Sequence, residues 1–163
     1  MKILDPKIRV DRLSMIPLNK LRSEGFKGIL IDLDNTLVPW RKNHISEETS
    51  AFVQEAKTMG FHICLFSNAL SDRALSISQT LDIQCKPEAR KPFKKNFKIV
   101  IEAMGIKPEE TLVIGDQIFT DILGGNFAEC YTILLPPLDD REFIGTKCLR
   151  LLEKLCGYHQ TAK

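Results

Sequence analysis

The chain contains 163 residues and has a mass of 18.5 kDa, a length that suggests one domain with a core of its own. Apolar residues make up 44% and charged residues 27% of the sequence, which excludes disordered, collagen-like and low-complexity proteins. The 23 Lys and Arg exceed the 21 Asp and Glu by two, so the overall charge gives no reason to expect a nucleic-acid partner.

The sequence favours a cytoplasmic location. No apolar run approaches the roughly 20 residues that a membrane-spanning helix needs. Residues 1–6 lack the continuous apolar segment of a signal peptide. The cysteines are odd in number, scattered and never in a CxxC motif, so we expect reduced thiols at Cys64, Cys85, Cys130, Cys148 and Cys156.

Apolar periodicity predicts strands and helices that alternate along most of the chain. In chain order, the expected elements are a strand at 28–31, a helix within 46–60, a strand at 61–66, a helix at 71–81, a strand at 83–85, a helix within 93–105, a strand at 111–114, a helix at 118–124, a strand at 131–135, and a helix built on Phe143, Ile144, Leu151, Leu152 and Leu155. Residues 1–19 contain apolar side chains at a spacing that predicts no particular element.

This alternation predicts an α/β fold. The central strands are apolar throughout, which favours a mostly parallel sheet of about five strands covered by helices on both faces. We expect residues 1–163 to form a single domain, with an N-terminal extension at 1–19 and a C-terminal helix and tail at 138–163. Ligands of such sheets bind beyond the carboxyl ends of the strands, so the chemistry is expected there.

Polar and charged side chains follow four of the predicted strands. Asp32 and Asp34 come after the first strand, and the later strand ends are followed by Ser67, Asn68, Lys91, Asp116, Thr120 and Asp121. Carboxylates gathered at one edge repel one another unless a cation lies among them, and oxygen ligands suit Mg²⁺ better than zinc. One carboxylate can attack phosphorus to form an aspartyl-phosphate, and a second can transfer the protons.

These residues resemble the four motifs of the haloacid dehalogenase (HAD) superfamily: DLDNT at 32–36, Ser67, Lys91 and GDQIFTD at 115–121. Longer segments within residues 20–137 are similar to the YqeG-type branch of the subclass IIIA phosphatases, namely GILIDLDNTLVPW, LFSNA, EARKPF and VIGDQIFTDILGGN. That branch includes relatives acting on phosphatidylglycerophosphate. The resemblance implies a Rossmann-like HAD core and a Mg²⁺-dependent phosphomonoester hydrolase with an aspartyl-phosphate intermediate.

The resemblance also implies catalytic and metal-binding roles. Asp32 matches the nucleophile, which is also a Mg²⁺ ligand. Asp34 matches the general acid and base, and its backbone carbonyl is a further metal ligand. Asp116 matches the second carboxylate on the metal.

The remaining motif positions match residues that support these groups. Ser67 and the backbone amide of Asn68 are expected to hold phosphate oxygens. Lys91 is expected to bind phosphate and to neutralise the nucleophile. Asp121 matches a residue that orients metal-bound water or pairs with the lysine, and Thr36 one that positions the loop of the general acid.

Two segments that carry a cap domain in many HAD enzymes are short here. Residues 37–45 and 84–92 leave no room for a cap, so the site is expected to be open. An open site can accept a phosphate on a large molecule, such as a lipid head group, protein, nucleic-acid end or polysaccharide. This agrees with phosphatidylglycerophosphate as the best substrate prediction but does not select it.

Basic residues surround the lysine motif, and they form either an ordinary solvated face or a positive rim that attracts an anionic substrate or lipid. Trp40 and Phe93 are expected near the same edge, where they either pack or touch lipid. Peripheral contact with the inner face of the membrane is therefore one interpretation.

Two other functions stay open, namely a HAD phosphatase for a soluble sugar phosphate, nucleotide or phosphoprotein, and a weakly hydrolytic binding or assembly factor. A signalling receiver domain is disfavoured, because a receiver carries its paired acids on the first strand and its phosphorylated aspartate on the third. In this sequence the third strand ends near Lys91, and the last acids follow the fourth strand. The sequence does not predict the oligomeric state.

Overall fold

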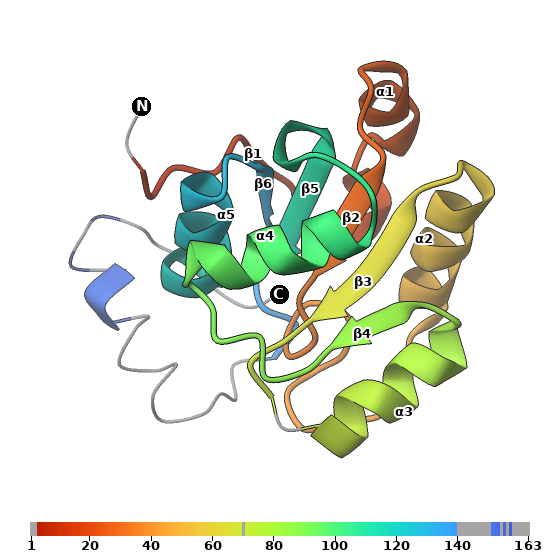
Figure 1. Ribbon diagram of the computed structural model, residues 1–163. Helices are drawn as coiled ribbons and strands as arrows, with labels where there is room; N and C mark the ends of the chain where they lie inside the picture. The colour runs from red at the N-terminus through yellow and green to blue at the C-terminus, as the bar shows by residue number, and fades with distance from the viewer. Residues whose placement is uncertain (1–2, 70, 140–150, 154, 156, 158–163) are drawn as a thin grey trace.

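The computed structural model describes residues 3–69, 71–139, 151–153, 155 and 157, and the architecture below is that of this part of the chain. Its centre is a sheet of six strands in which all neighbouring strands are parallel, in the order β1-β6-β5-β2-β3-β4 (Figure 1). The strands are β1 (Ile8–Arg9), β2 (Gly28–Ile31), β3 (His62–Phe66), β4 (Gln84–Lys86), β5 (Thr111–Gly115) and β6 (Tyr131–Leu134).

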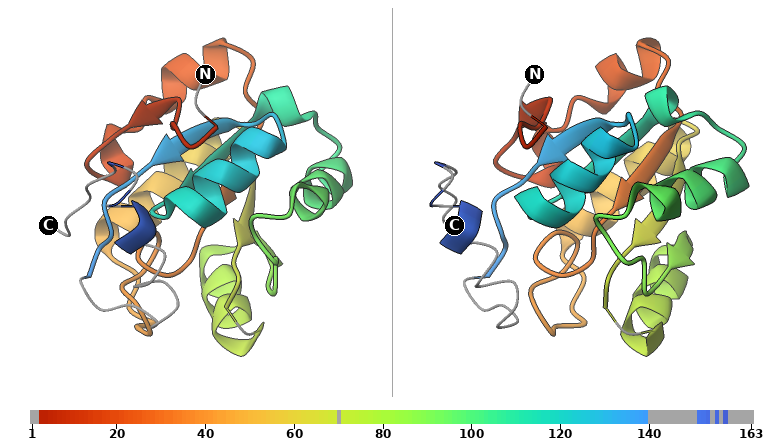
Figure 2. Two further views of the ribbon diagram at one scale, coloured as in Figure 1. Left: turned by 90° about the vertical axis from the view of Figure 1, so that its left-hand side faces the viewer. Right: turned by 60° about the vertical axis from the view of Figure 1, so that its left-hand side comes forward.

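Helices cover both faces of the sheet (Figure 2). α1 (Leu18–Ser23), α2 (Glu47–Thr58) and α3 (Ser71–Leu81) lie on one face, and α4 (Lys94–Ala103) and α5 (Leu123–Phe127) lie on the other. Three short helical turns complete the described elements: η1 (Leu13–Met15), η2 (Pro108–Glu110) and the π-helix η3 (Ile118–Ile122). The predicted α/β fold is therefore confirmed.

The sheet contains six strands instead of about five because the N-terminal extension joins it. Ile8 of β1 lies opposite Ile133 of β6, and Val10 N donates to Leu134 O at 3.1 Å. Leu13 and Ile16 then pack into the core. The apolar spacing of residues 1–19 predicts no element because the structure uses only very short ones there.

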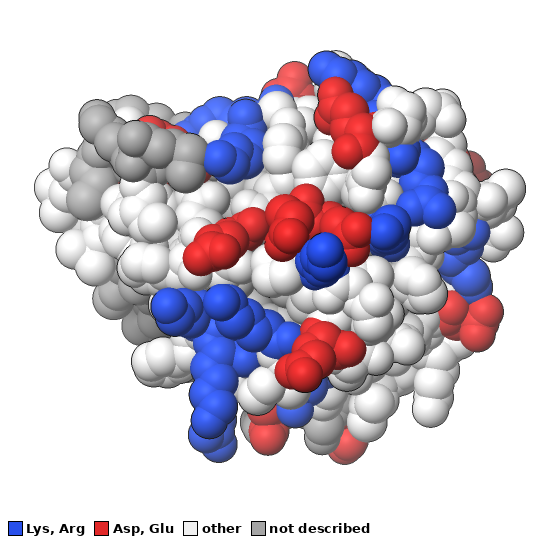
Figure 3. Space-filling model, turned by 45° about the horizontal axis from the view of Figure 1, so that its top comes forward, with Lys and Arg blue, Asp and Glu red and all other residues white. Residues whose placement is uncertain are grey.

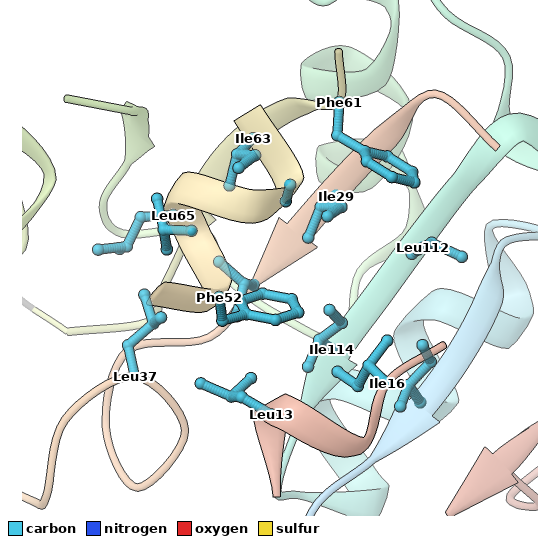
Figure 4. Packing of buried hydrophobic residues seen from close by; sticks show 14 of the residues in the cluster. Leu13, Ile16, Ile29, Leu37, Phe52, Phe61, Ile63, Leu65, Leu112 and Ile114 are labelled. Atoms are coloured by element: carbon cyan, nitrogen blue, oxygen red, sulfur yellow. The ribbon is translucent and has the colours of Figure 1, made fainter. Parts of the chain in front are cut away.

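The core has two parts, one on each face of the sheet, because successive strand residues point in opposite directions. Ile29 and Ile31 of β2 belong to the cluster under α2, whereas Leu30 belongs to the cluster under α4. Figure 4 shows Phe52 of α2 packing among the aliphatic side chains on the first face. β2 is thus buried on both faces, as its continuous apolar sequence indicates.

Local signals explain where the main helices begin and end. Ser46 caps α2 by accepting a hydrogen bond from Thr49 N at 3.1 Å. Glu47 and Glu48 lie in the first turn, where their negative charges interact favourably with the positive end of the helix dipole. Gly60 and Gly105 follow α2 and α4 with φ of 78° and 70°, a conformation that glycine adopts without a steric penalty. The helices predicted within 46–60 and 93–105 are therefore confirmed.

The helix predicted at 118–124 is present, but it begins as the π-helix η3 and continues as α5. Of the helix predicted near the C-terminus, Phe143 and Ile144 lie outside the described residues, whereas residues 151–153 are helical. Within the part of the chain that the structure describes, no helix is both long and apolar enough to cross a membrane.

Candidate active site

The carboxyl ends of the central strands finish at one level of the sheet. Ile31 of β2 lies in register with Leu65 of β3 and Ile114 of β5, and each of these strands is followed by a loop with polar side chains. Asp32 N still donates to Ile114 O at 2.9 Å, which fixes the first carboxylate at this edge. The structure brings together at this edge the site residues that the sequence predicts: Asp32, Asp34, Thr36, Ser67, Asn68, Lys91, Asp116 and Asp121.

Lys91 lies between two buried carboxylates. Its Nζ is 2.5 Å from Asp32 Oδ1 and 2.6 Å from Asp121 Oδ1. Burial by itself lowers the pKa of Lys91, but the carboxylates of Asp121 and Asp32 outweigh this effect and hold the pKa above its ordinary value. The ammonium group is therefore charged and positioned next to the predicted nucleophile.

Asp32 is 6% exposed, and burial is the largest influence on its acidity. Burial raises the pKa of Asp32 to about 7, because a carboxylate loses its hydration there. The charge of Lys91 acts in the opposite direction, and the nearby carboxylates of Asp121 and Asp34 raise the pKa further. Asp32 therefore keeps its proton to a higher pH than an ordinary aspartate does.

The surplus of carboxylates fits a divalent cation. Asp32, Asp116 and Asp121 are buried, and one carboxylate oxygen of each lies within 4.8 Å of the others. When all three are ionised, three carboxylates against one ammonium leave two negative charges, and the oxygen-only donor set suits Mg²⁺. Thr36 Oγ1 donates to Asp116 Oδ1 at 3.3 Å and so orients this carboxylate.

Asp121 reaches the site because β5 ends in a glycine. A Cβ atom on Gly115 would lie 2.2 Å from Asp121 Cγ, so the aspartate side chain occupies the space over the glycine. Gln117 N donates to Asp121 Oδ2 at 3.1 Å, and Asp121 itself belongs to the π-helix η3. π-helical turns are often found at functional sites.

The loop after β3 contacts the loop that holds Lys91 through the side chain of Asn68, for which the sequence predicts only a role of the backbone amide. We expected the backbone amide of Asn68 to bind phosphate, but its side chain also has a role. Asn68 Oδ1 accepts from Lys91 N at 2.7 Å, and Asn68 Nδ2 donates to Lys91 O at 3.2 Å. Ser67 is buried, and its Oγ accepts from Ala69 N at 3.1 Å.

Asp34 has a partner that the sequence analysis missed. Arg73 Nη2 of α3 donates to Asp34 Oδ1, to which Arg41 N also donates at 3.2 Å. Arg73 Nη1 donates to Lys42 O at 3.2 Å. A cation in the first turn of a helix is unfavourable because that end of the helix dipole is positive. The position of Arg73 in the first turn of α3 was therefore the one local signal of an unusual role.

Among the residues that the structure describes, no inserted domain covers the site. The loops from Asp32 to Ser46 and from 87 to 93 are described throughout, and neither contains one. Phe93 is 69% exposed and Leu138 46% exposed, and the Arg41 guanidinium lies 4.6 Å from the centre of the Trp40 ring. Figure 3 brings the top of Figure 1 forward and so shows the part of the molecule away from the carboxyl ends of the strands; basic and acidic side chains both occur there, so that face does not carry a single charge.

Comparison with known proteins identifies the family. The HAD-hydrolase-like family model matches residues 88–136. The probable phosphatase YqeG of Bacillus subtilis is 35% identical over 153 residues, which cover 94% of this chain and 89% of that protein. The chain belongs to the YqeG family of HAD phosphatases. HAD phosphatases generally use a divalent metal, which agrees with the acidic cluster.

A further relative of this HAD phosphatase is the chloroplastic/mitochondrial phosphatidylglycerophosphate phosphatase 1 of Arabidopsis thaliana. It is 27% identical over 146 residues, which cover 84% of this chain and 42% of that protein. Among solved structures, the cobalt-bound deoxy-D-mannose-octulosonate 8-phosphate phosphatase of Haemophilus influenzae has a TM-score of 0.56 at 17% identity, over 80% of this chain and 77% of that one.

An uncharacterized protein from Listeria monocytogenes has a TM-score of 0.58 at 18% identity, over 79% of this chain and 99% of that one. These two structures share the fold.

Proposed function

We propose that this HAD phosphatase hydrolyses a phosphate monoester in two steps through an aspartyl-phosphate on Asp32. The observation that carries the proposal is the position of Asp32, which is buried, 2.5 Å from Lys91 Nζ, and grouped with Asp116 and Asp121. An isolated buried carboxylate would be neutral, but one beside a cation can serve as a nucleophile.

In the first step, a carboxylate oxygen of Asp32 attacks phosphorus, and the bond from phosphorus to the alcohol oxygen breaks. Asp34 gives its proton to the leaving oxygen, so a neutral alcohol departs. Lys91, Ser67 and the backbone amide of Asn68 hold the phosphoryl oxygens, because N–H and O–H donors stabilise the charge that develops there.

In the second step, water attacks the phosphorus of the aspartyl-phosphate and the bond to Asp32 breaks. Asp34 now accepts a proton from the water, which returns it to its starting state. Inorganic phosphate leaves and Asp32 is again a free carboxylate. Asp121 keeps Lys91 in place through both steps by its 2.6 Å contact.

Asp32, Asp116 and the backbone carbonyl of Asp34 are the groups that we propose as ligands of Mg²⁺. When bound, the ion shields the attacking carboxylate from the negative phosphate and supports the charge of the transition state. The chain supplies the surplus of carboxylates that such an ion neutralises.

We propose phosphatidylglycerophosphate as the substrate. The Arabidopsis relative supports this choice through its name, and neither described loop at the site contains the cap domain that would enclose a small substrate. Exposed basic and apolar side chains near the lysine motif suit contact with an anionic bilayer surface: Arg90, Phe93, Lys94, Lys95 and Leu138. We also propose that the enzyme is cytoplasmic and contacts the membrane peripherally.

Phosphate release tests the function. The wild type is assayed with Mg²⁺ on phosphatidylglycerophosphate in mixed micelles and on a panel of soluble phosphomonoesters. Asp32→Asn should abolish turnover, whereas Asp82→Asn, at a highly exposed side chain, should retain it. Turnover by Asp32→Asn contradicts its role as the nucleophile.

Two results would change the proposal in different ways. Preference for a soluble ester keeps the chemistry and rejects the lipid substrate. A folded wild type that hydrolyses nothing in the presence of Mg²⁺ contradicts the proposed hydrolysis and favours a binding or assembly factor. Co-sedimentation with phosphatidylglycerol vesicles, reduced in Phe93→Ser, tests the membrane contact separately.

A further inference from the structure

The site contains two cations with different neighbours. Lys91 contacts Asp32 and Asp121, on the side where the phosphoryl group is proposed to bind. Arg73 contacts Asp34, the group proposed to give a proton to the leaving alcohol. Arg73 therefore lies on the alcohol side of the bond that breaks.

Arg73 and Asp34 form a partly buried ion pair. The Arg73 side chain is 20% exposed and that of Asp34 is 23% exposed, so both are partly removed from water. Arg73 Nη1 also donates to Lys42 O at 3.2 Å, which fixes the direction of the guanidinium. A guanidinium has five N–H donors in a planar fork, more than these two contacts use.

The loop beside Arg73 adds further positive charge. Arg41 and Lys42 are exposed and directly follow the segment that holds Asp34. The Arg41 guanidinium lies over the Trp40 ring, at 4.6 Å from its centre, and so stays near the mouth. Asp34 is thus paired with Arg73, next to a loop that carries two more cations.

We propose that Arg73 binds a second anionic group on the substrate, an oxyanion such as a phosphodiester carried by the leaving alcohol. This inference rests on the proposed function, because that function places Asp34 next to the leaving oxygen. An alcohol that departs past Asp34 brings its next substituent to the guanidinium. Arginine binds such oxyanions with two parallel hydrogen bonds, which a neutral substituent does not accept with equal strength.

The experiment compares two soluble substrates that differ only in this group. One is 3-hydroxypropyl phosphate, and the other carries a methyl phosphodiester on its second oxygen. The wild type, Arg73→Gln and Arg73→Lys are assayed with Mg²⁺ at constant ionic strength. Lys20→Gln is the matched control, because it removes an exposed positive charge on α1, at the opposite edge of the sheet (Figure 1).

We expect the wild type to prefer the diester substrate in kcat/KM by roughly 10- to 100-fold, the range of a charge-assisted hydrogen bond. The preference should come mainly from KM. Arg73→Gln should reduce it to near one, Arg73→Lys should keep part of it because a single charge remains, and Lys20→Gln should leave it unchanged.

Equal kcat/KM for both substrates in the wild type overturns the proposal. So does an Arg73→Gln variant that loses the same factor on both substrates, since Arg73 would then act only by positioning Asp34. Circular dichroism verifies that each variant is folded.

Failure of the proposed hydrolysis is recognised separately. If the wild type turns over neither compound, calorimetric titration measures the dissociation constants of both with the wild type and Arg73→Gln. Tighter binding of the diester that depends on Arg73 supports the subsite even then. Binding that is equal, absent or independent of Arg73 overturns it.

Discussion

The side chain of Asn68 and the backbone of Lys91 are joined by two hydrogen bonds in opposite directions. Lys91 N donates to Asn68 Oδ1 at 2.7 Å, and Asn68 Nδ2 donates to Lys91 O at 3.2 Å. The pair connects the loop after β3 with the loop after β4. It therefore sets the position from which the Lys91 side chain enters the site.

Asn68→Ala tests this connection, because it removes both bonds and keeps the backbone amide that is proposed to bind phosphate. We expect kcat to fall by about tenfold or more, while the free energy of unfolding falls by only about 1 kcal/mol. Steady-state kinetics and urea unfolding measure the two effects. Asn19→Ala, at an exposed position of α1, should change neither. Unchanged kcat in Asn68→Ala would show that Lys91 is held without this pair.

Gly115→Ala should disturb the site through Asp121. The new methyl group would lie 2.2 Å from Asp121 Cγ, so the buried carboxylate must move away from Lys91. We expect a loss of about 1–3 kcal/mol in the free energy of unfolding and a large loss of phosphatase activity.

A double-mutant cycle identifies the cause of the Gly115→Ala effect. An alanine at position 121 would keep the Cβ atom that lies 2.6 Å from the new methyl group, so the background is Asp121→Gly. There the methyl group meets no side chain of residue 121, so the same substitution should cost less stability by at least about 0.5 kcal/mol. Chemical denaturation of the four proteins provides the comparison. Additive losses would indicate that the backbone of residue 115, and not the contact with Asp121, is responsible.

The sequence predicts the central strands and the long helices because their signals are local. β2 is a short apolar run, and α2 combines a Ser46 cap with Phe52 and Ala56 at helical spacing. The N-terminal segment has no such signal, since β1 contains only two residues and is recognised as a strand by its pairing with β6. Periodicity needs several residues to be visible, and these elements are too short.

In the candidate site too, some features are predictable from the sequence and others are not. Motif order places the carboxylates and Lys91 at the ends of neighbouring strands, where the structure has them. The side-chain contacts of Asn68 and Arg73 join residues 23 and 39 positions apart, and no local pattern predicts such pairs. Resemblance to a family implies roles for the motif residues but does not imply these connections between loops.

Glu153 connects the C-terminal helical residues to the site. It is 2% exposed, and its Oε1 accepts a hydrogen bond from Ile118 N, the first residue of η3, at 2.7 Å. Glu153→Ala removes this acceptor for a buried N–H, so we expect a loss of about 1–3 kcal/mol in the free energy of unfolding. Glu153→Gln keeps an acceptor oxygen and is the matched control. Equal losses in the two variants would assign the effect to the charge of Glu153.

Magnesium should stabilise the protein more as the pH rises from 6 to 8. In the metal-free protein the pKa of Asp32 is raised to about 7, so the folded state binds more protons than the unfolded state between about pH 4 and 7. Raising the pH through this range therefore lowers the contribution of Asp32 to stability. Mg²⁺ competes with the same proton, so its affinity rises as Asp32 ionises.

Thermal unfolding with Mg²⁺ and with EDTA measures the effect at pH 6, 7 and 8. A Mg²⁺ concentration of 100 times Kd adds about 2.7 kcal/mol, which raises Tm by roughly 5–10 °C for a chain of this size. Below the pKa of Asp32, each pH unit weakens binding about tenfold, so the Tm increase at pH 6 should be clearly smaller than at pH 8. Asp32→Asn removes the titrating group and should make the remaining increase much less dependent on pH. An equal Tm increase at pH 6 and pH 8 in the wild type would mean that the ion binds without displacing a proton from Asp32.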